Sequence, residues 1–245
     1  MAVITVFRQA GCKGRYIAEE VARALGYHFS DYWIAERLLL LHGFSQAPDV
    51  YQSVPDFWDR FTRKGPERDA VNSMLREITL AQAQHGDVVM LGRGCFAPLQ
   101  GLSDVLNVRV KAPLDLRIEQ VMSDKQMTEE EATEFVAEKD ALVAAFPKTS
   151  YGMSPDDPAS FDVVIDTGKV DPDEAVRFLT AAVRSLSSTT GGEATTAALE
   201  VDSVMAAAVA GEFERLEGLR AEGWELRSEL PGAAADSLHS GGGAS

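Results

Sequence analysis

Cysteine and long apolar runs are both scarce in this chain. The two cysteines, Cys12 and Cys95, are too few for a disulfide framework among 245 residues, and a reducing cytoplasm fits this usage. The leucine run Leu38–Leu41 is far shorter than the roughly 20 residues that span a bilayer, and no apolar run of the chain approaches that length. The N-terminus has no basic segment followed by an apolar one. We therefore expect neither a membrane span nor a secretion signal.

Positive charge is scarce as well. The formal net charge is −15 at pH 7, which argues against general binding to the phosphate backbone of DNA or RNA. A mononucleotide needs only a local cluster of cations, so the acidity does not exclude a nucleotide ligand. Hydrophobic residues make up 45% of the chain and charged residues 25%, which is the composition of a soluble globular protein.

The most informative stretch that is present is the loop at residues 8–15, RQAGCKGR. A β-branched run precedes it at residues 3–7, and a helix-like segment that Gly26 closes follows it. This order of strand, glycine-containing turn and helix binds phosphate, because unpaired backbone N–H groups and the helix dipole face the anion. Lys13 and Arg15 add full charges. The loop therefore predicts a phosphate site, although an ordinary strand-to-helix turn also favours glycine.

The loop departs from the standard phosphate-loop pattern G-x-x-x-x-G-K-[ST]. Gly14 stands at the position of the lysine, Arg15 at that of the hydroxyl residue, and Arg8 at that of the first glycine. The hydroxyl that would ligate Mg²⁺ is therefore missing, and the sequence leaves the metal ligands unknown.

Four runs rich in valine and isoleucine alternate with helix-like segments. The runs lie at residues 3–7, 87–92, 105–110 and 161–166. Helices are expected at 69–85, 113–121, 128–145 and 171–186, the third opening on a capping box of Thr128 and Glu131. This alternation predicts an α/β protein whose parallel sheet is covered by helices on both faces.

The remaining segments differ in composition. Residues 38–65 are irregular and aromatic, and are interpreted as an insertion that packs its own small core or covers a substrate. Residues 187–196 are a Ser/Thr/Gly linker. Residues 197–230 predict an amphipathic helix, which must bury its apolar face against the main domain or another subunit. The glycine-rich tail 231–245 is expected to be disordered.

Two shorter motifs lie where predicted elements meet. Arg93 stands between Gly92 and Gly94 after a strand, where its guanidinium fork is free to meet a phosphate. Asp31, with Arg37 six residues later, could bind a sugar, a base or Mg²⁺. Asp31 suits equally well the N-cap of a helix at residues 32–41.

Together these segments resemble the cytidylate-kinase-like family, relatives of the nucleoside monophosphate kinases that carry a degenerate phosphate loop. Four stretches match in order and spacing across roughly residues 1–185: ITVFRQAGCKGRYIAEEVARALGYHFSDYWI, GDVVMLGRGCF, NVRVKAPLDLRIEQVMSDKQMTEEEA and FDVVIDTGKVDPDEAVRFL. The resemblance implies a P-loop NTPase-like three-layer sandwich at residues 1–186, with the acceptor-side insertion at 38–65 and a lid-like region at 124–158.

The resemblance also implies roles for single residues. The donor phosphates would lie on Gly11, Cys12, Lys13, Gly14, Arg15 and Tyr16, and the acceptor on Asp31, Arg37, Gly92 and Arg93. Lys13, Arg15, Arg93 and Lys139 would stabilise the charge of the transition state, and Arg117 matches a residue near the start of the lid. The implied reaction transfers the γ-phosphoryl group of ATP, with Mg²⁺, to CMP or a related small acceptor.

One departure from the family pattern keeps other functions open. The lid position that should carry an arginine is Val143, and losing such a cation can cost a factor of about 10³ in rate. A nucleotide-binding or scaffold protein, acting through a protein partner or self-assembly at its C-terminal helix, is the alternative. A kinase for a non-nucleotide small molecule is a third. The kinase hypothesis requires the guanidinium groups of residues 15, 37 and 93 to converge on one cavity.

Overall fold

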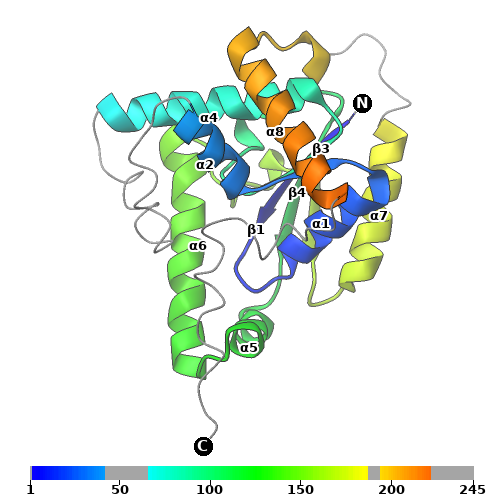
Figure 1. The fold of residues 1–245 in the computed structure, drawn as a ribbon. Helices are drawn as coiled ribbons and strands as arrows, with labels where there is room; N and C mark the ends of the chain where they lie inside the picture. Colours follow the sequence, from blue (N-terminus) through cyan, green and yellow to red (C-terminus); the bar gives the residue numbers. More distant parts are fainter. Residues whose placement is uncertain (1, 42–65, 187–193, 222–245) are drawn as a thin grey trace, which may run out of the picture.

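The structure is a computed structural model, and it describes residues 2–41, 66–186 and 194–221 (Figure 1). Its centre is a parallel five-stranded sheet with strand order β2-β3-β1-β4-β5. In chain order the strands are β1 (Val3–Arg8), β2 (His28–Ser30), β3 (Val88–Leu91), β4 (Val105–Lys111) and β5 (Val163–Asp166). The predicted α/β fold with a parallel sheet is therefore confirmed.

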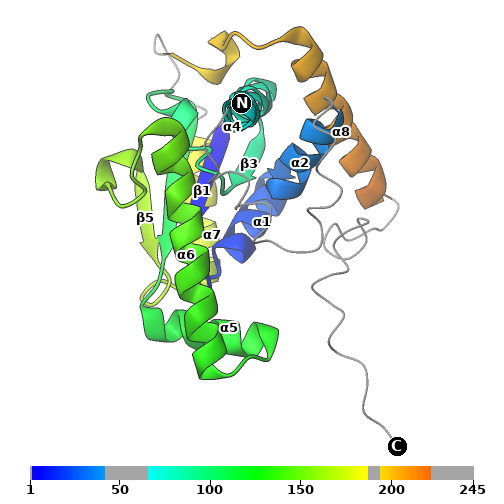
Figure 2. The same ribbon diagram turned by 90° about the vertical axis from the view of Figure 1, so that its left-hand side faces the viewer.

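Helices cover both faces of this sheet. They are α1 (Gly14–Leu25), α2 (Tyr32–Leu41), α4 (Pro66–His85), α5 (Leu114–Lys125), α6 (Glu129–Tyr151), α7 (Pro172–Leu186) and α8 (Ser203–Ala221). The described residues also include the short 3₁₀ helices η2 (Ala97–Leu99), η3 (Pro158–Ser160) and η4 (Thr196–Ala198). Helices α5 and α6 pack against each other; α5 lies beyond one end of the sheet, and α6 runs from there alongside the sheet (Figure 2).

The two faces of β1 build two separate hydrophobic cores, because successive side chains of a strand point to opposite faces. Val3 packs on one face among residues of α2, α4 and α8. Ile4 and Val6 pack on the other face among residues of α1 and α7. β1 pairs with β3 on one side and with β4 on the other, so it is the central strand and is buried almost throughout.

Several element predictions need correction. β2 was not predicted as a strand, because its three residues are too short for a pattern of period two to show. The helix expected to stop near residue 145 continues through Pro147 to Tyr151 and ends at Gly152. Phe146 and Pro147 are buried against the core, and this packing offsets the hydrogen bond that proline cannot donate. Residues 38–41, which were expected to be irregular, belong to α2, with Leu38 and Leu39 in the core.

Other parts of the predicted organisation lie outside the described residues: 42–65, most of the linker, and the chain from residue 222 onward. Within the part of the chain that the structure describes, no helix is both long and apolar enough to cross a bilayer.

The C-terminal helix α8 buries its apolar face within the same chain. It packs on α4 and α2 and adds Met205, Val209, Phe213 and Leu216 to the core on that face (Figure 1). The Phe213 ring stacks on His28 of β2, with ring centroids 4.3 Å apart and planes 4° from parallel. The sequence left open whether this face packs on the main domain or on another subunit, and in the structure it packs on the main domain.

Polar contacts also attach the C-terminal segment to the domain. Glu212, only 4% exposed, accepts hydrogen bonds from Arg37 Nε of α2 at 2.8 Å and from Arg215 Nε at 2.9 Å. Ahead of the helix, Thr196 donates through its N–H and its hydroxyl to the buried Asp104 carboxylate. A buried carboxylate is tolerated only with such partners, so these contacts fix where the segment docks.

We expect Phe213→Ala to lower the free energy of unfolding by about 3–5 kcal/mol, because it leaves a cavity in the core and removes the contact with His28. Val204→Ala on the same helix is the control, since Val204 is 64% exposed and should change stability by about 0.5 kcal/mol or less. Urea denaturation measures both. Equal effects of the two variants would contradict the docked position of α8.

Candidate active site

The loop between β1 and α1 has the conformation expected of a phosphate site. Lys13 caps α1 with φ of 56°, in the left-handed region, and its side chain is exposed. Gly11 has φ of 76°, and a Cβ there would collide with the backbone carbonyl oxygen of Arg117. Only glycine therefore fits at residue 11. The first N–H groups of α1 have no partners within the helix, which makes this end suited to an anion.

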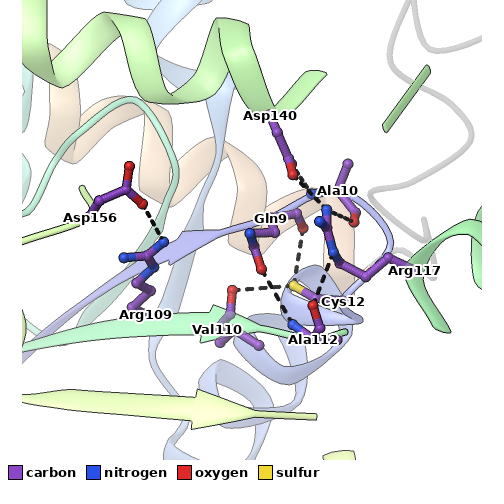
Figure 3. Close-up of polar contacts among 9 residues, drawn as sticks. All are labelled: Gln9, Ala10, Cys12, Arg109, Val110, Ala112, Arg117, Asp140 and Asp156. Atoms are coloured by element: carbon purple, nitrogen blue, oxygen red, sulfur yellow. Dashed lines mark hydrogen bonds and ion pairs between the residues drawn. The ribbon is translucent and has the colours of Figure 1, made fainter. Parts of the chain in front are cut away.

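Two residues from outside the loop hold its first half in place (Figure 3). Asp140 of α6 accepts a hydrogen bond from the Ala10 N–H at 2.8 Å and pairs with Arg117 Nη1 at 2.6 Å. Arg117, 6% exposed, also donates to the carbonyl oxygens of Ala10 and Ala112. The sequence placed Arg117 near the lid, but it gave no sign that Asp140 reaches the loop, because 130 residues separate Asp140 from Ala10.

Arg15 connects the loop to the end of β2. Its Nη2 atom pairs with Asp31 Oδ2 at 2.7 Å, and its Nε atom pairs with Glu19 at 2.7 Å. Asp31 Oδ1 accepts a hydrogen bond from the Trp33 N–H at 3.0 Å. The bond to Trp33 fits the interpretation of Asp31 as the N-cap of α2, and its other oxygen faces the phosphate loop, whereas binding of a sugar, a base or Mg²⁺ by Asp31 stays a prediction.

A pocket opens beside Asp31, at the carboxyl ends of β2 and β3. Its polar lining includes Asp31, Thr79, Gln82, Arg93 and Tyr151. Its volume of about 30 Å³ has room for about two water molecules and is far below that of small-ligand pockets, roughly 300–1,000 Å³, so a ligand the size of a nucleotide requires the pocket to open. Ligands of parallel α/β proteins bind at this edge of the sheet.

Arg93 reaches this pocket from a strained turn. Its φ is 53°, between Gly92 and Gly94, which also have positive φ. A Cβ at Gly94 would lie 2.9 Å from Pro147 Cβ of α6, so this turn packs tightly on the lid-like region. Left-handed backbone at a residue other than glycine costs about 1–3 kcal/mol and is concentrated at functional sites. The turn is therefore a second indication that Arg93 has a role in the pocket.

Glu36 is a buried acid of this region that no sequence pattern singles out. It lies on α2 and is 3% exposed. Burial raises the pKa of its carboxyl group, the charge of Arg93 opposes this shift, and the charge of Asp31 adds to it. Glu36 therefore interacts electrostatically with two residues that line the pocket, Arg93 and Asp31.

Arg37, the neighbour of Glu36, is placed differently. It was predicted to bind the acceptor, but its guanidinium group pairs with Glu212 of α8, and the described residues that line the pocket do not include it. Arg93 lines the pocket, and Arg15 reaches it through Asp31. Of the three predicted guanidinium groups, that of Arg93 lines the cavity, that of Arg15 binds a lining residue, and that of Arg37 binds α8, so their convergence on one cavity stays a prediction.

The other predicted residues lie around the loop and the lid-like helix. Cys12 is buried under the loop, and burial raises the pKa of its thiol. The Tyr16 hydroxyl bonds to Asp173 at the start of α7. The Lys139 ammonium group lies 5.3 Å from the centroid of the Phe135 ring. Val143, at the position of the expected arginine, packs on the aromatic cluster of Phe7, Phe96 and Phe161.

The described residues contain no group of three or more His, Cys, Asp or Glu side chains that could hold a metal ion. Asp31 and Asp140, the acids beside the loop, are each paired with an arginine. These residues therefore do not form a cation site of their own.

Comparison with known proteins identifies the family. The model of the cytidylate kinase-like family matches residues 3–169. The chain belongs to this family. It is 32% identical over 136 residues to a cytidylate kinase of Methanopyrus kandleri, covering 52% of this chain and 70% of that protein. It is 27% identical over 178 residues to a cytidylate kinase of Pyrobaculum aerophilum, covering 73% and 90%.

A solved structure has a fold similar to that of this chain. The crystal structure of an uncharacterized protein from Eubacterium ventriosum aligns with a TM-score of 0.60 at 14% identity. The alignment covers 76% of this chain and 99% of that one. The family resemblance inferred from the four sequence segments is confirmed by the match to the family model.

The raised pKa of Glu36 predicts a pH-dependent difference between the wild type and Glu36→Gln. The folded protein holds this proton to a higher pH than the unfolded chain does, so the group's contribution to stability falls as pH rises from about 4.5 through the folded pKa. Glutamine has no such proton. We expect Glu36→Gln to gain stability relative to the wild type over this range, in urea titrations from pH 4 to pH 8. A relative loss that grows with pH would contradict a buried, desolvated carboxyl group.

Proposed function

We propose that this protein transfers the γ-phosphoryl group of ATP to a nucleoside monophosphate of the CMP type. One observation carries the proposal: Arg15, in the first turn of α1, pairs with Asp31, which lines the pocket that Arg93 also lines. The loop would hold the donor and the pocket the acceptor. The family membership and the two cytidylate kinases similar to the chain support the same reaction.

The charges suit this chemistry. Phosphoryl transfer depends on positioning and on neutralising charge at the transferred group, and it needs no strong base. Lys13 and Arg15 would act on the donor phosphates. Arg93 would hold the phosphate of the acceptor through its planar fork. Asp31 would keep Arg15 oriented and accept a hydrogen bond from the acceptor.

Mg²⁺ would enter with ATP. Magnesium in kinases is held largely by substrate phosphates and water, with one or two carboxylates from the protein. The two acids beside the loop are already paired with arginines, so we assign Mg²⁺ to the nucleotide phosphates and derive no step from a protein ligand. A cytoplasmic location, expected from the two unpaired cysteines, belongs to the same proposal.

A second candidate is a nucleotide-binding protein that does not transfer phosphate. Val143 supports it, because the position expected to carry a lid arginine is occupied by a side chain packed on an aromatic cluster. Such a protein would act through a partner or through self-assembly. The apolar face of α8 is already covered by α2 and α4, so either contact would have to use another surface.

Formation of ADP separates the two candidates. The purified protein is mixed with ATP, Mg²⁺ and a panel of monophosphates, and we expect turnover with CMP or a close relative. Arg93→Ala should lower kcat/KM for the acceptor about a hundredfold or more, because it removes a cation from the transferring group. Arg177→Ala, on the surface of α7, is the matched control and should have no effect.

Two results would contradict the proposal. Thermal stabilisation by ATP or ADP without turnover on any monophosphate would favour the second candidate. Full activity of Arg93→Ala would place the acceptor elsewhere.

A further inference from the structure

Helix α6 contacts the phosphate loop through a direct hydrogen bond. Asp140 uses both carboxylate oxygens, one for the Ala10 N–H at 2.8 Å and the other for Arg117 Nη1 at 2.6 Å (Figure 3). The same Nη1 atom lies 3.2 Å from the Ala10 carbonyl oxygen. Asp140 of α6 and Arg117 of α5 therefore bind the backbone N–H and the backbone carbonyl of one loop residue, Ala10.

Arg117 also determines the space beneath the loop. Its carbonyl oxygen lies against Gly11, where any Cβ would collide with it, and its Nε atom bonds to the Ala112 carbonyl at 3.1 Å. Ala112 in turn donates to the Gln9 side chain at 3.4 Å. Residues 9–11 are thus fixed by α5, by α6 and by the end of β4, in addition to their own turn.

We propose that Asp140 and Arg117 are positioning residues for the donor site, a brace by which the lid-like helices set the conformation of the phosphate loop. The inference rests on the proposed binding of the ATP phosphates at this loop. A loop without the standard lysine and hydroxyl residue has fewer side chains to order it around phosphate. The brace supplies that order from outside the loop, at the peptide that immediately precedes Gly11.

A second arginine–aspartate pair, Arg109 with Asp156, serves as the control for this proposal. Arg109 of β4 pairs with Asp156 at 2.8 Å and bonds to the Pro155 carbonyl, and no bond joins this arginine–aspartate pair to the loop in Figure 3. Asp156 is 79% exposed on its side chain, whereas Asp140 is 26% exposed. Loss of the Arg109–Asp156 pair should leave donor binding unchanged.

The test is calorimetric titration of the full-length protein with ATP, ADP and CMP. In Asp140→Asn the side chain is neutral and has only one acceptor oxygen, so it cannot accept both hydrogen bonds. We expect ATP and ADP to bind roughly tenfold more weakly, which corresponds to the loss of one charged hydrogen bond. CMP binding should stay within about twofold of the wild type. Asp156→Asn should change neither. Arg117→Lys, which retains the charge, should weaken ATP binding in the same direction.

Amide hydrogen exchange at Ala10 gives a readout that does not depend on ligand affinity. The Ala10 N–H should be protected in the wild type and in Asp156→Asn, and should exchange faster in Asp140→Asn without a matching change across the core strands. Faster exchange throughout the protein would indicate general destabilisation and would overturn a positioning role.

Other outcomes overturn the brace as well. Tighter ATP binding by Asp140→Asn would mean that the carboxylate competes with phosphate, and equal loss of ATP and CMP binding would mean a structural role alone. A wild type that binds neither ATP nor ADP would remove the donor site and the brace with it. A wild type that binds ATP but transfers nothing would contradict only the proposed function.

Discussion

The ion pair between Arg15 and Asp31 is the contact on which the arrangement of the site depends. It joins the first turn of α1 to the end of β2, two strands away from β1 in the sheet, and it brings the phosphate loop and the pocket together. The Asp31 side chain is 8% exposed and that of Arg15 27%, so water screens the pair only partly. Removing either member would leave the other as a poorly solvated charge without this partner, and breaking an ion pair in this way costs more than replacing both members.

Around this pair, separate parts of the chain each fix one part of the site. Helices α5 and α6 hold the phosphate loop through Arg117 and Asp140. Helix α6 also packs on the turn of Arg93 through Pro147. The C-terminal helix α8 binds Arg37 through the buried Glu212, and Arg37 is not among the residues that line the pocket. A segment beyond the region matched to the family thus becomes part of the same core and takes one predicted acceptor residue as its own partner.

Local patterns were sufficient for most of the fold. Runs of valine and isoleucine identified four of the five strands, and the Thr128–Glu131 capping box located the start of α6 with both of its hydrogen bonds present. β2 was not predicted because three residues are too few to show the two-residue alternation of a strand. The end of α6 was misplaced because a buried proline was tolerated by tertiary packing, which no local propensity encodes.

The site was predictable where backbone geometry determines it and not where long-range contacts do. Glycines around Arg93 and a glycine-containing loop after β1 pointed correctly to turns at the carboxyl ends of strands. The partners of the side chains did not follow from the sequence: Glu212 binds Arg37 from 175 residues away, and Asp140 reaches Ala10 from 130 residues away. Glu36 and Arg37 are adjacent, yet helical geometry directs them to different surroundings, and without the position of α8 the sequence could not say which of them faces Arg93.

The central claim is that the phosphate loop and the pocket form one continuous site for donor and acceptor. A bisubstrate analogue that links adenosine and cytidine through a chain of phosphates tests this directly, with its affinity measured by calorimetry beside those of ATP and CMP. The account predicts binding at least about a hundredfold tighter than that of ATP alone, because the second half binds at a high effective concentration. An affinity equal to that of ATP would contradict it.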